Sequence, residues 1–203
     1  MNTFKETFKK IIKGRPKEDK PIISVKILDI CGMISVLQAL RLPFGKECRS
    51  HGEEDFAFEK GENVDIWYER KYCEIDHRDL LLLSTLVRRG DEHSKAIRGL
   101  IVYAEIDAPR FFWQEMDTYK VGTERLSSES TMHIQGKGLS TEELVKMKSD
   151  LKEGTMQKRI QMFSYQTLRR IYYQRRDHRL PHWRLFCEWM ETLPYFNELI
   201  KTE

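Results

Sequence analysis

The chain has 203 residues with 40% hydrophobic and 11% aromatic side chains, and its 35 basic residues nearly balance 32 acidic ones. Such a composition is typical of a folded domain with a buried core and excludes an intrinsically disordered chain. The net charge of +3 is too small to predict a nucleic-acid partner. No apolar run approaches the roughly 20 residues needed to cross a membrane. Because no signal peptide is recognisable either, we expect a soluble cytoplasmic protein.

Residues 1–21 are predicted to be an appendage, and residues 22–203 a single domain. The appendage has the pattern of a short basic helix with one apolar face, formed by Phe4, Phe8, Ile11 and Ile12. A basic amphipathic helix lies on a membrane surface or a partner, or packs on its own domain, which is the more common case.

The first part of the domain begins with a strand and a helix. Ile22–Ile30 has the alternating apolar pattern of a strand, and Met33–Arg41, followed by Pro43, is predicted to be a helix. Glu47–Asn63 is polar and is predicted to be a loop, whereas Val64–Tyr72 has strand-forming composition.

The four cysteines are too widely spaced for a disulfide framework. Cys48-x-x-His51 and Cys73-x-x-x-His77 have spacings that a zinc site allows, but the chain has no CxxC knuckle, and Cys73 and His77 flank a predicted helix start. We therefore predict no metal site.

A helix is predicted between Asp76 and Gly90. Asp76 is the expected N-cap, Asp79 takes the capping-box position, and Gly90 is the stop. The expected buried stripe consists of Leu80, Leu83, Leu86 and Val87. His93 follows in a polar loop, where a histidine most often bonds to the backbone.

The segment Asp107–His133 combines a helix with a run of hydroxyl groups. Asp107 as N-cap, Pro109 in the first turn and Gly122 as stop predict a helix that reaches about Lys120. Beyond it, five hydroxyl side chains fall within nine residues, at Thr123, Ser127, Ser128, Ser130 and Thr131. A helix end leading into such a loop suits an anion or a nucleotide, although surface loops rich in Ser and Thr are common.

Three further helices are predicted towards the C-terminus. Ser140 and Glu143 form a capping box for a helix that reaches about Lys152. Phe163–Arg176 is the next, and Pro181 begins the last, whose expected inner face consists of Trp183, Phe186, Cys187 and Met190.

Six arginines fall within sixteen residues, at Arg169, Arg170, Arg175, Arg176, Arg179 and Arg184. A guanidinium fork suits phosphate or the edge of a uracil ring because it donates two parallel hydrogen bonds. The alternative interpretation is a solvated basic face.

From His93 to Thr123 the chain resembles, without a gap, the core of the flavin-dependent thymidylate synthases. That family has a histidine, a strand, Ala-Pro, and a helix with the signature Gln-x-x-Arg-His-Arg-x-x-Ser. The counterparts here are His93, Arg98–Ile106, Ala108-Pro109 and Glu115–Thr123. In that last segment glutamate replaces the glutamine, Thr118-Tyr119-Lys120 replaces Arg-His-Arg, and threonine replaces the serine.

Two later family segments also have counterparts. The family's Asn-Glu-x-Ser-x-Arg-Tyr is similar to the stretch around Ser128 once a two-residue insertion is allowed, with Ser130 as the serine and Met132 in place of the arginine. The family's late helix resembles 164–175, where Arg175 keeps the terminal arginine. Arg159 is the counterpart of the arginine that precedes this helix.

The resemblance implies an α+β fold with a small sheet flanked by helices, assembled as a homotetramer with shared sites. It implies FAD, with His93, Tyr119 and Lys120 on the flavin side. It also implies dUMP or a related pyrimidine nucleotide, bound by Glu115, Ser128, Ser130, Arg159 and Arg175, the last of which polarises the base. The implied reaction is reductive methylation with methylenetetrahydrofolate. Because most of the signature is replaced, an inactive or altered nucleotide-binding homo-oligomer on the same scaffold is the alternative.

Overall fold

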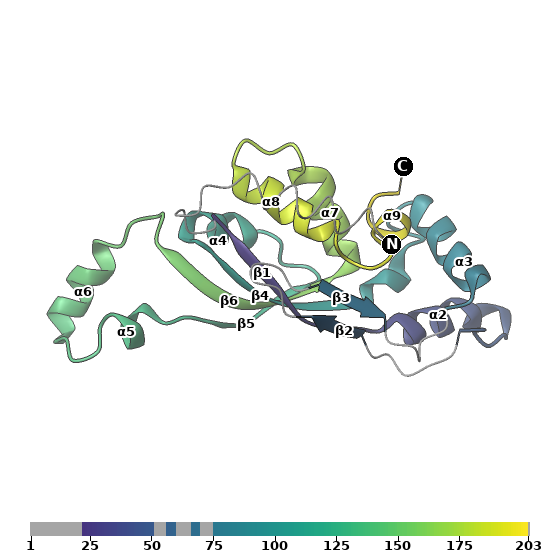
Figure 1. The fold of residues 1–203 in the computed structure, drawn as a ribbon, viewed down its shortest axis with the longest axis horizontal. Helices are drawn as coiled ribbons and strands as arrows, with labels where there is room; N and C mark the ends of the chain where they lie inside the picture. Colours follow the sequence, from purple (N-terminus) through teal and green to yellow (C-terminus); the bar gives the residue numbers. More distant parts are fainter. Residues whose placement is uncertain (1–21, 51–55, 60–65, 70–74, 203) are drawn as a thin grey trace.

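An antiparallel four-stranded sheet is the centre of the fold (Figure 1). The computed structural model describes residues 22–50, 56–59, 66–69 and 75–202. The strands are arranged in the order β1-β4-β6-β5, which are Ser24–Cys31, Ile101–Pro109, Met156–Ser164 and Thr123–Ser128. A separate two-stranded sheet pairs β2 (Phe56–Glu59) with β3 (Ile66–Glu69). The predicted α+β class, with helices flanking a small sheet, is confirmed.

Helices cover one face of the four-stranded sheet. Val102, Ala104 and Ile106 of β4 are buried on that face, and the residues between them are only half-buried on the other. Figure 1 shows three helices on the covered side, α4 (Arg110–Met116), α7 (Tyr165–Arg175) and α8 (Pro181–Met190). The ring of Trp183 lies 4.5 Å from that of Phe112 between α8 and α4, so aromatic packing fixes these helices to one another.

A second group of helices packs at one end of the sheet, at the right in Figure 1. Its members are α2 (Met33–Arg41), η1 (Leu42–Phe44), α3 (His77–Arg88), η2 (Lys95–Arg98) and α9 (Phe196–Leu199). Asp76 is the N-cap of α3, as predicted, and accepts a hydrogen bond from the amide of Arg78. The capping-box role predicted for Asp79 is wrong, because its buried carboxylate instead binds Arg41 at 2.6 Å and the amides of Arg49 and Ser50.

An arm formed by residues 129–155 projects from the opposite end, between β5 and β6 (Figure 1). It contains α5 (Thr131–Ile134) and α6 (Thr141–Ser149), neither of which has a buried residue. The predicted capping box between Ser140 and Glu143 is present. Four large apolar side chains of the arm are exposed, namely Met132, Ile134, Leu139 and Val145.

Three sequence predictions are corrected by strand pairing. The helix expected from Asp107 to about Lys120 is only α4, because β4 continues to Pro109 through its ladder with β6. The expected hydroxyl-rich loop is largely the strand β5, which pairs with β6. The helix expected from Phe163 begins at Tyr165, and β6 itself was not predicted.

The remaining sequence predictions concern the region of β2 and β3, the N-terminal appendage, and membrane or metal sites. The loop expected over Glu47–Asn63 contains β2, and the strand expected over Val64–Tyr72 is represented by β3. Residues 1–21 and two of the considered zinc ligands, His51 and Cys73, lie outside the described residues. Within the described ranges, no helix has the length and hydropathy of a membrane span, and no group of His, Cys, Asp and Glu is arranged to hold a metal.

Candidate functional site

Arg175, at the end of α7, is the centre of a cluster formed by three helices. Its Nε donates to the hydroxyl of Tyr119 at 2.7 Å, and its Nη1 donates to Oε2 of Glu115 at 2.5 Å. The guanidinium also lies over the ring of Trp183, 4.4 Å from its centroid, where a cation is attracted by the aromatic face. We call Glu115, Tyr119, Arg175, His178 and Trp183 the Arg175 cluster.

Each member of the Arg175 cluster is held by more than one contact. Oε2 of Glu115 accepts a second hydrogen bond from the indole Nε1 of Trp183 at 2.9 Å. Tyr119 donates its hydroxyl proton to Gln174 at 2.9 Å. His178 Nε2 lies 2.9 Å from Nη1 of Arg175. The arginine side chain is therefore fixed in place, although 17% of it and 33% of the glutamate side chain remain exposed.

The cluster keeps hydrogen-bonding capacity for a ligand. In the described part of the chain, no protein group bonds to Oε1 of Glu115 or to Nη2 of Arg175. A carboxylate oxygen can only accept and a guanidinium nitrogen can only donate. The ion pair therefore offers one acceptor and one donor to the solvent side.

Arg159, on β6, forms a second cationic position. It is 7% exposed, its Nη1 donates to Asp117 at 2.7 Å, and its guanidinium lies 4.5 Å from the centre of the Trp113 ring. Burial lowers the pKa of Arg159, and the ion pair with Asp117 partly offsets that shift. Ser128 is directly opposite Arg159 in the β5–β6 ladder, so these two predicted substrate residues are neighbours.

Ser130 has a local structural role in this structure. Its side chain caps the short helix α5, where the amide of His133 lies 3.4 Å from the hydroxyl oxygen. The hydroxyl therefore already has a backbone partner. Met132, which stands where the resembled family has an arginine, is exposed and contributes no charge.

Two of the three predicted flavin-side residues, Tyr119 and Lys120, are neighbours in the sequence, whereas His93 lies towards the other end of α7. His93 is exposed in the turn before η2, beside Asp91, whose carbonyl accepts from Gln166 near the start of α7. Tyr119 contacts the last turn of α7, at Gln174 and Arg175. These contacts lie nine residues apart, roughly 13 Å along the helix at 1.5 Å per residue. His93 and Tyr119 are therefore near opposite ends of α7.

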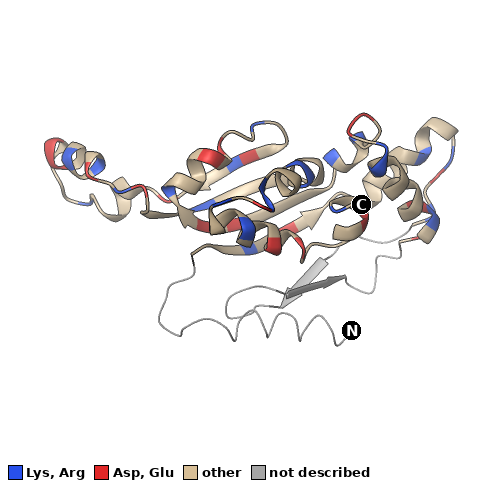
Figure 2. Ribbon diagram, turned by 90° about the horizontal axis from the view of Figure 1, so that it is seen from above, with Lys and Arg blue, Asp and Glu red and all other residues tan. Residues whose placement is uncertain are grey.

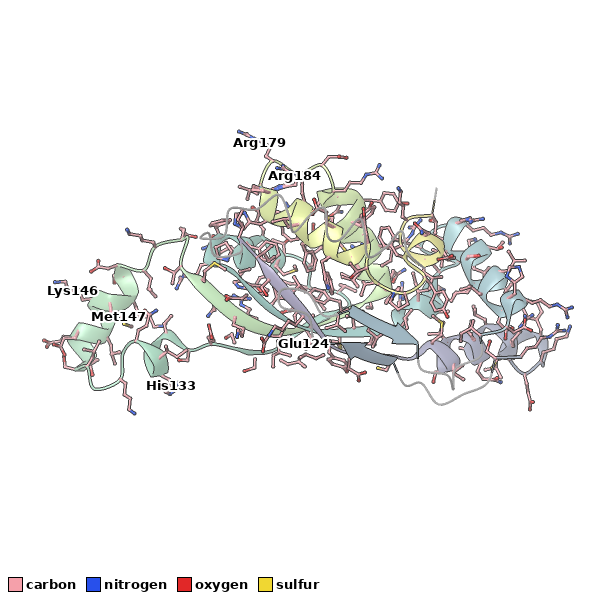
Figure 3. All side chains as sticks on the ribbon, in the orientation of Figure 1. Glu124, His133, Lys146, Met147, Arg179 and Arg184 are labelled. Carbon is pink, nitrogen blue, oxygen red and sulfur yellow. The ribbon has the colours of Figure 1, made fainter. Side chains whose placement is uncertain are left out.

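The six C-terminal arginines have different surroundings. Arg175 is held inside its cluster, whereas Figure 3 shows Arg179 and Arg184 extending outward at the α7–α8 connection. Arg184 Nη1 donates to the carbonyls of His178 and Arg179 at 2.7 and 3.1 Å, so it stabilises that turn. Acidic and basic residues are interspersed along the described chain rather than segregated (Figure 2).

Two members of the Arg175 cluster were not predicted as site residues. Trp183 was expected only as part of an apolar stripe, and His178 was not singled out. The polar edge of the indole and the position of His178 depend on how α8 packs against α4, which the periodicity of either segment does not indicate.

The fold defined by these elements is that of the flavin-dependent thymidylate synthases. A Helicobacter pylori enzyme of that kind, solved with FAD and dUMP, matches with a TM-score of 0.60 at 13% identity, over 88% of this chain and 98% of that one. A second structure of that protein gives 0.58 at 12% identity, over 88% and 97% of the two chains. A UMP/dUMP methylase from Streptomyces cacaoi, bound with 5-Br dUMP, gives 0.53 at 12% identity, over 87% and 91%.

The likeness lies in the structure rather than in the sequence. No family model matches the chain, and no curated protein matches it by sequence. The expected resemblance in fold is confirmed, and the roles of individual residues remain predictions.

Proposed function

We propose that the chain binds dUMP or a related pyrimidine nucleotide at the Arg175 cluster. The observation that carries this proposal is the Glu115–Arg175 ion pair, which leaves one acceptor and one donor unbonded. The imide edge of uracil has the complementary pattern, an N–H donor beside a carbonyl acceptor. Arg175 would orient and polarise the base through its fork, and Glu115 would accept the imide proton.

The proposed reaction is the reductive methylation of that nucleotide, with FAD and methylenetetrahydrofolate. When bound, reduced flavin supplies hydride. Tyr119 and Lys120 would contact it from one subunit and His93 from a second copy, because His93 lies near the opposite end of α7 from Tyr119. Burial raises the pKa of Cys187 to about 12, so that thiol stays protonated at neutral pH and is not assigned as a nucleophile.

The second candidate function is nucleotide binding without redox chemistry. Thr118-Tyr119-Lys120 stands where the resembled family has Arg-His-Arg. Tyr119 already uses its hydroxyl as acceptor from Arg175 and as donor to Gln174. Both observations favour a site that keeps the base-binding cluster and has lost flavin contacts.

Absorbance of the purified protein separates the two candidates. A yellow protein that releases FAD on denaturation supports the enzyme. A colourless protein that does not bind added FAD, but binds dUMP in a calorimetric titration, supports the second candidate, nucleotide binding without redox chemistry. Binding of neither FAD nor dUMP contradicts both.

We infer that the protein assembles into a homotetramer whose sites are shared between subunits. The support is the projecting arm, because Ile134 and Val145 are 62% and 61% exposed there and an isolated arm would leave this apolar surface in water.

The assembly is predicted to depend on that apolar surface. Light scattering at micromolar concentration should give a tetramer for the wild type and a smaller species for Val145→Glu, because a charge there opposes burial. Gln135→Glu adds the same charge at an exposed polar position of the arm and should leave the mass unchanged. A stable wild-type monomer would refute the assembly.

A further inference from the structure

Most polar atoms of the Arg175 cluster are already bonded within the protein. The hydroxyl of Tyr119 has both a donor and an acceptor partner. The indole Nε1 of Trp183 donates to Glu115, and both ring nitrogens of His178 have protein contacts. Among the described residues, the side-chain atoms that the cluster leaves for a ligand are therefore Oε1 of Glu115 and Nη2 of Arg175.

The free acceptor is a carboxylate oxygen whose partner oxygen is held in place. Oε2 of Glu115 accepts from Arg175 at 2.5 Å and from Trp183 at 2.9 Å, and Nε2 of His178 lies 3.7 Å from it. The carboxylate is therefore fixed with Oε1 on its open side. Because a carboxylate oxygen only accepts and a guanidinium nitrogen only donates, the ligand edge must carry a donor beside an acceptor.

Two pyrimidine edges have that order, and they differ in the third group along the edge. The imide N–H of uracil lies between two carbonyls. When it donates to Oε1 and one carbonyl accepts from Nη2, the other carbonyl lies on the outer side of the carboxylate, where two negative oxygens oppose each other. The edge of cytosine begins with the 4-amino group, followed by N3 and the 2-carbonyl. When the amine donates to Oε1 and N3 accepts from Nη2, the carbonyl lies on the outer side of the guanidinium, where opposite charges meet.

We propose that the Arg175 cluster binds a cytosine nucleotide, such as dCMP, in preference to a uracil nucleotide. The proposal rests on the proposed function, because it needs the base at this cluster, and it narrows the class of pyrimidine. Glu115 accepts from the 4-amino group, a pairing that carboxylates make with cytosine in other proteins, and Arg175 donates to N3.

The charge state of residue 115 determines this preference. A glutamine there would direct its amide oxygen to the two donors, Arg175 and Trp183, that now bond to Oε2. Its NH2 group would then face the ligand, where the 4-amino group of cytosine would meet a second donor instead of an acceptor. Such a juxtaposition discriminates against a ligand through repulsion as well as through the loss of attraction.

The test is a calorimetric titration of the full chain with three nucleotides. They are dCMP, dUMP and the deoxynucleotide of pyrimidin-2-one, which differs from dCMP only by lacking the 4-amino group. Wild type should bind dCMP about tenfold more tightly than either of the others, as expected for one charge-assisted hydrogen bond. In Glu115→Gln, dCMP should lose its advantage over the pyrimidin-2-one nucleotide. Glu188→Gln removes the same charge from an exposed position of α8 and should keep that advantage.

The other outcomes overturn the preference for cytosine. If dUMP binds the wild type as tightly as dCMP does, the site does not select cytosine, although the proposed function stands. Equal wild-type affinities for dCMP and the pyrimidin-2-one nucleotide mean that the amino group makes no bond. An unchanged advantage of dCMP in Glu115→Gln assigns the amine to another residue. If a melting curve shows that this variant is unfolded, the comparison of ligands on the wild type decides. A wild type that binds none of the three contradicts the proposed function itself.

Discussion

Replacing Arg175 with lysine is expected to weaken dUMP binding roughly ten- to a hundredfold, the equivalent of about 1.5–3 kcal/mol for a charge-assisted hydrogen bond. An ammonium can still pair with Glu115, so the carboxylate keeps its counter-ion. Its three N–H donors radiate from one nitrogen, so they do not reproduce the planar fork with which the guanidinium reaches Tyr119, Glu115 and a base from separate nitrogens. Calorimetric titration of both proteins with dUMP measures the loss.

Arg175→Ala tests the same contact with a different side effect. It leaves Glu115 without its cation and Trp183 without the guanidinium over its ring, so we expect a lower melting temperature as well as the binding loss. Lysine is therefore the cleaner variant. Arg170→Ala lies about 140° around the same helix and should change little. If the Arg175→Lys variant binds dUMP as tightly as the wild type does, Arg175 does not hydrogen-bond to the base.

Local signals were sufficient for several elements of the fold. The apolar period and the proline after Arg41 predict α2 with the bounds that the structure has. Asp76, Ser140 and Pro181 mark the starts of α3, α6 and α8 correctly, because capping and proline effects act within a few residues.

Long-range pairing was the main source of error. β6 contains Lys158, Arg159 and Gln161, so its sequence lacks the apolar alternation by which a strand is recognised. Its strand character comes from ladders on both sides, with β4 and β5. The same ladder extends β4 to Pro109, at the expense of the first turn predicted for a helix beginning at Asp107.

The candidate site was predicted in part. The family resemblance named Glu115, Tyr119 and Arg175, which the structure brings into direct contact although 60 residues separate Glu115 from Arg175. It also named His93, which lies towards the other end of α7. The pairing of Arg125 with Gln161 could not be predicted from the sequence. It depends on the β5–β6 register, which is irregular between Arg125 and Ser127.

Asp79→Asn is expected to lower the free energy of unfolding by about 3 kcal/mol, the lower end of the range for breaking a buried ion pair. The Asp79 side chain is 1% exposed and accepts from Arg41, from the amides of Arg49 and Ser50 and from the Ser50 hydroxyl. An amide cannot replace these charge-assisted bonds, and it leaves Arg41 without its anion. The lower end applies because 18% of the Arg41 side chain reaches solvent.

The pH dependence of that loss provides a second readout. Burial alone would raise the pKa of Asp79, but the hydrogen bonds from Arg41, Arg49 and Ser50 together outweigh it and hold the pKa below its ordinary value. A carboxyl whose pKa is lower in the folded state stabilises the protein above its unfolded pKa of about 3.9, and this contribution is lost as the pH falls through the folded value. The difference in free energy of unfolding between wild type and Asp79→Asn, measured by urea denaturation, should therefore be largest at pH 7 and shrink below about pH 4. Asp91→Asn is the control, since that carboxylate is 53% exposed and 3.8 Å from Arg169 and should contribute less than about 1 kcal/mol. A wild-type advantage that persists unchanged into acid would mean that the amide disturbs packing rather than charge.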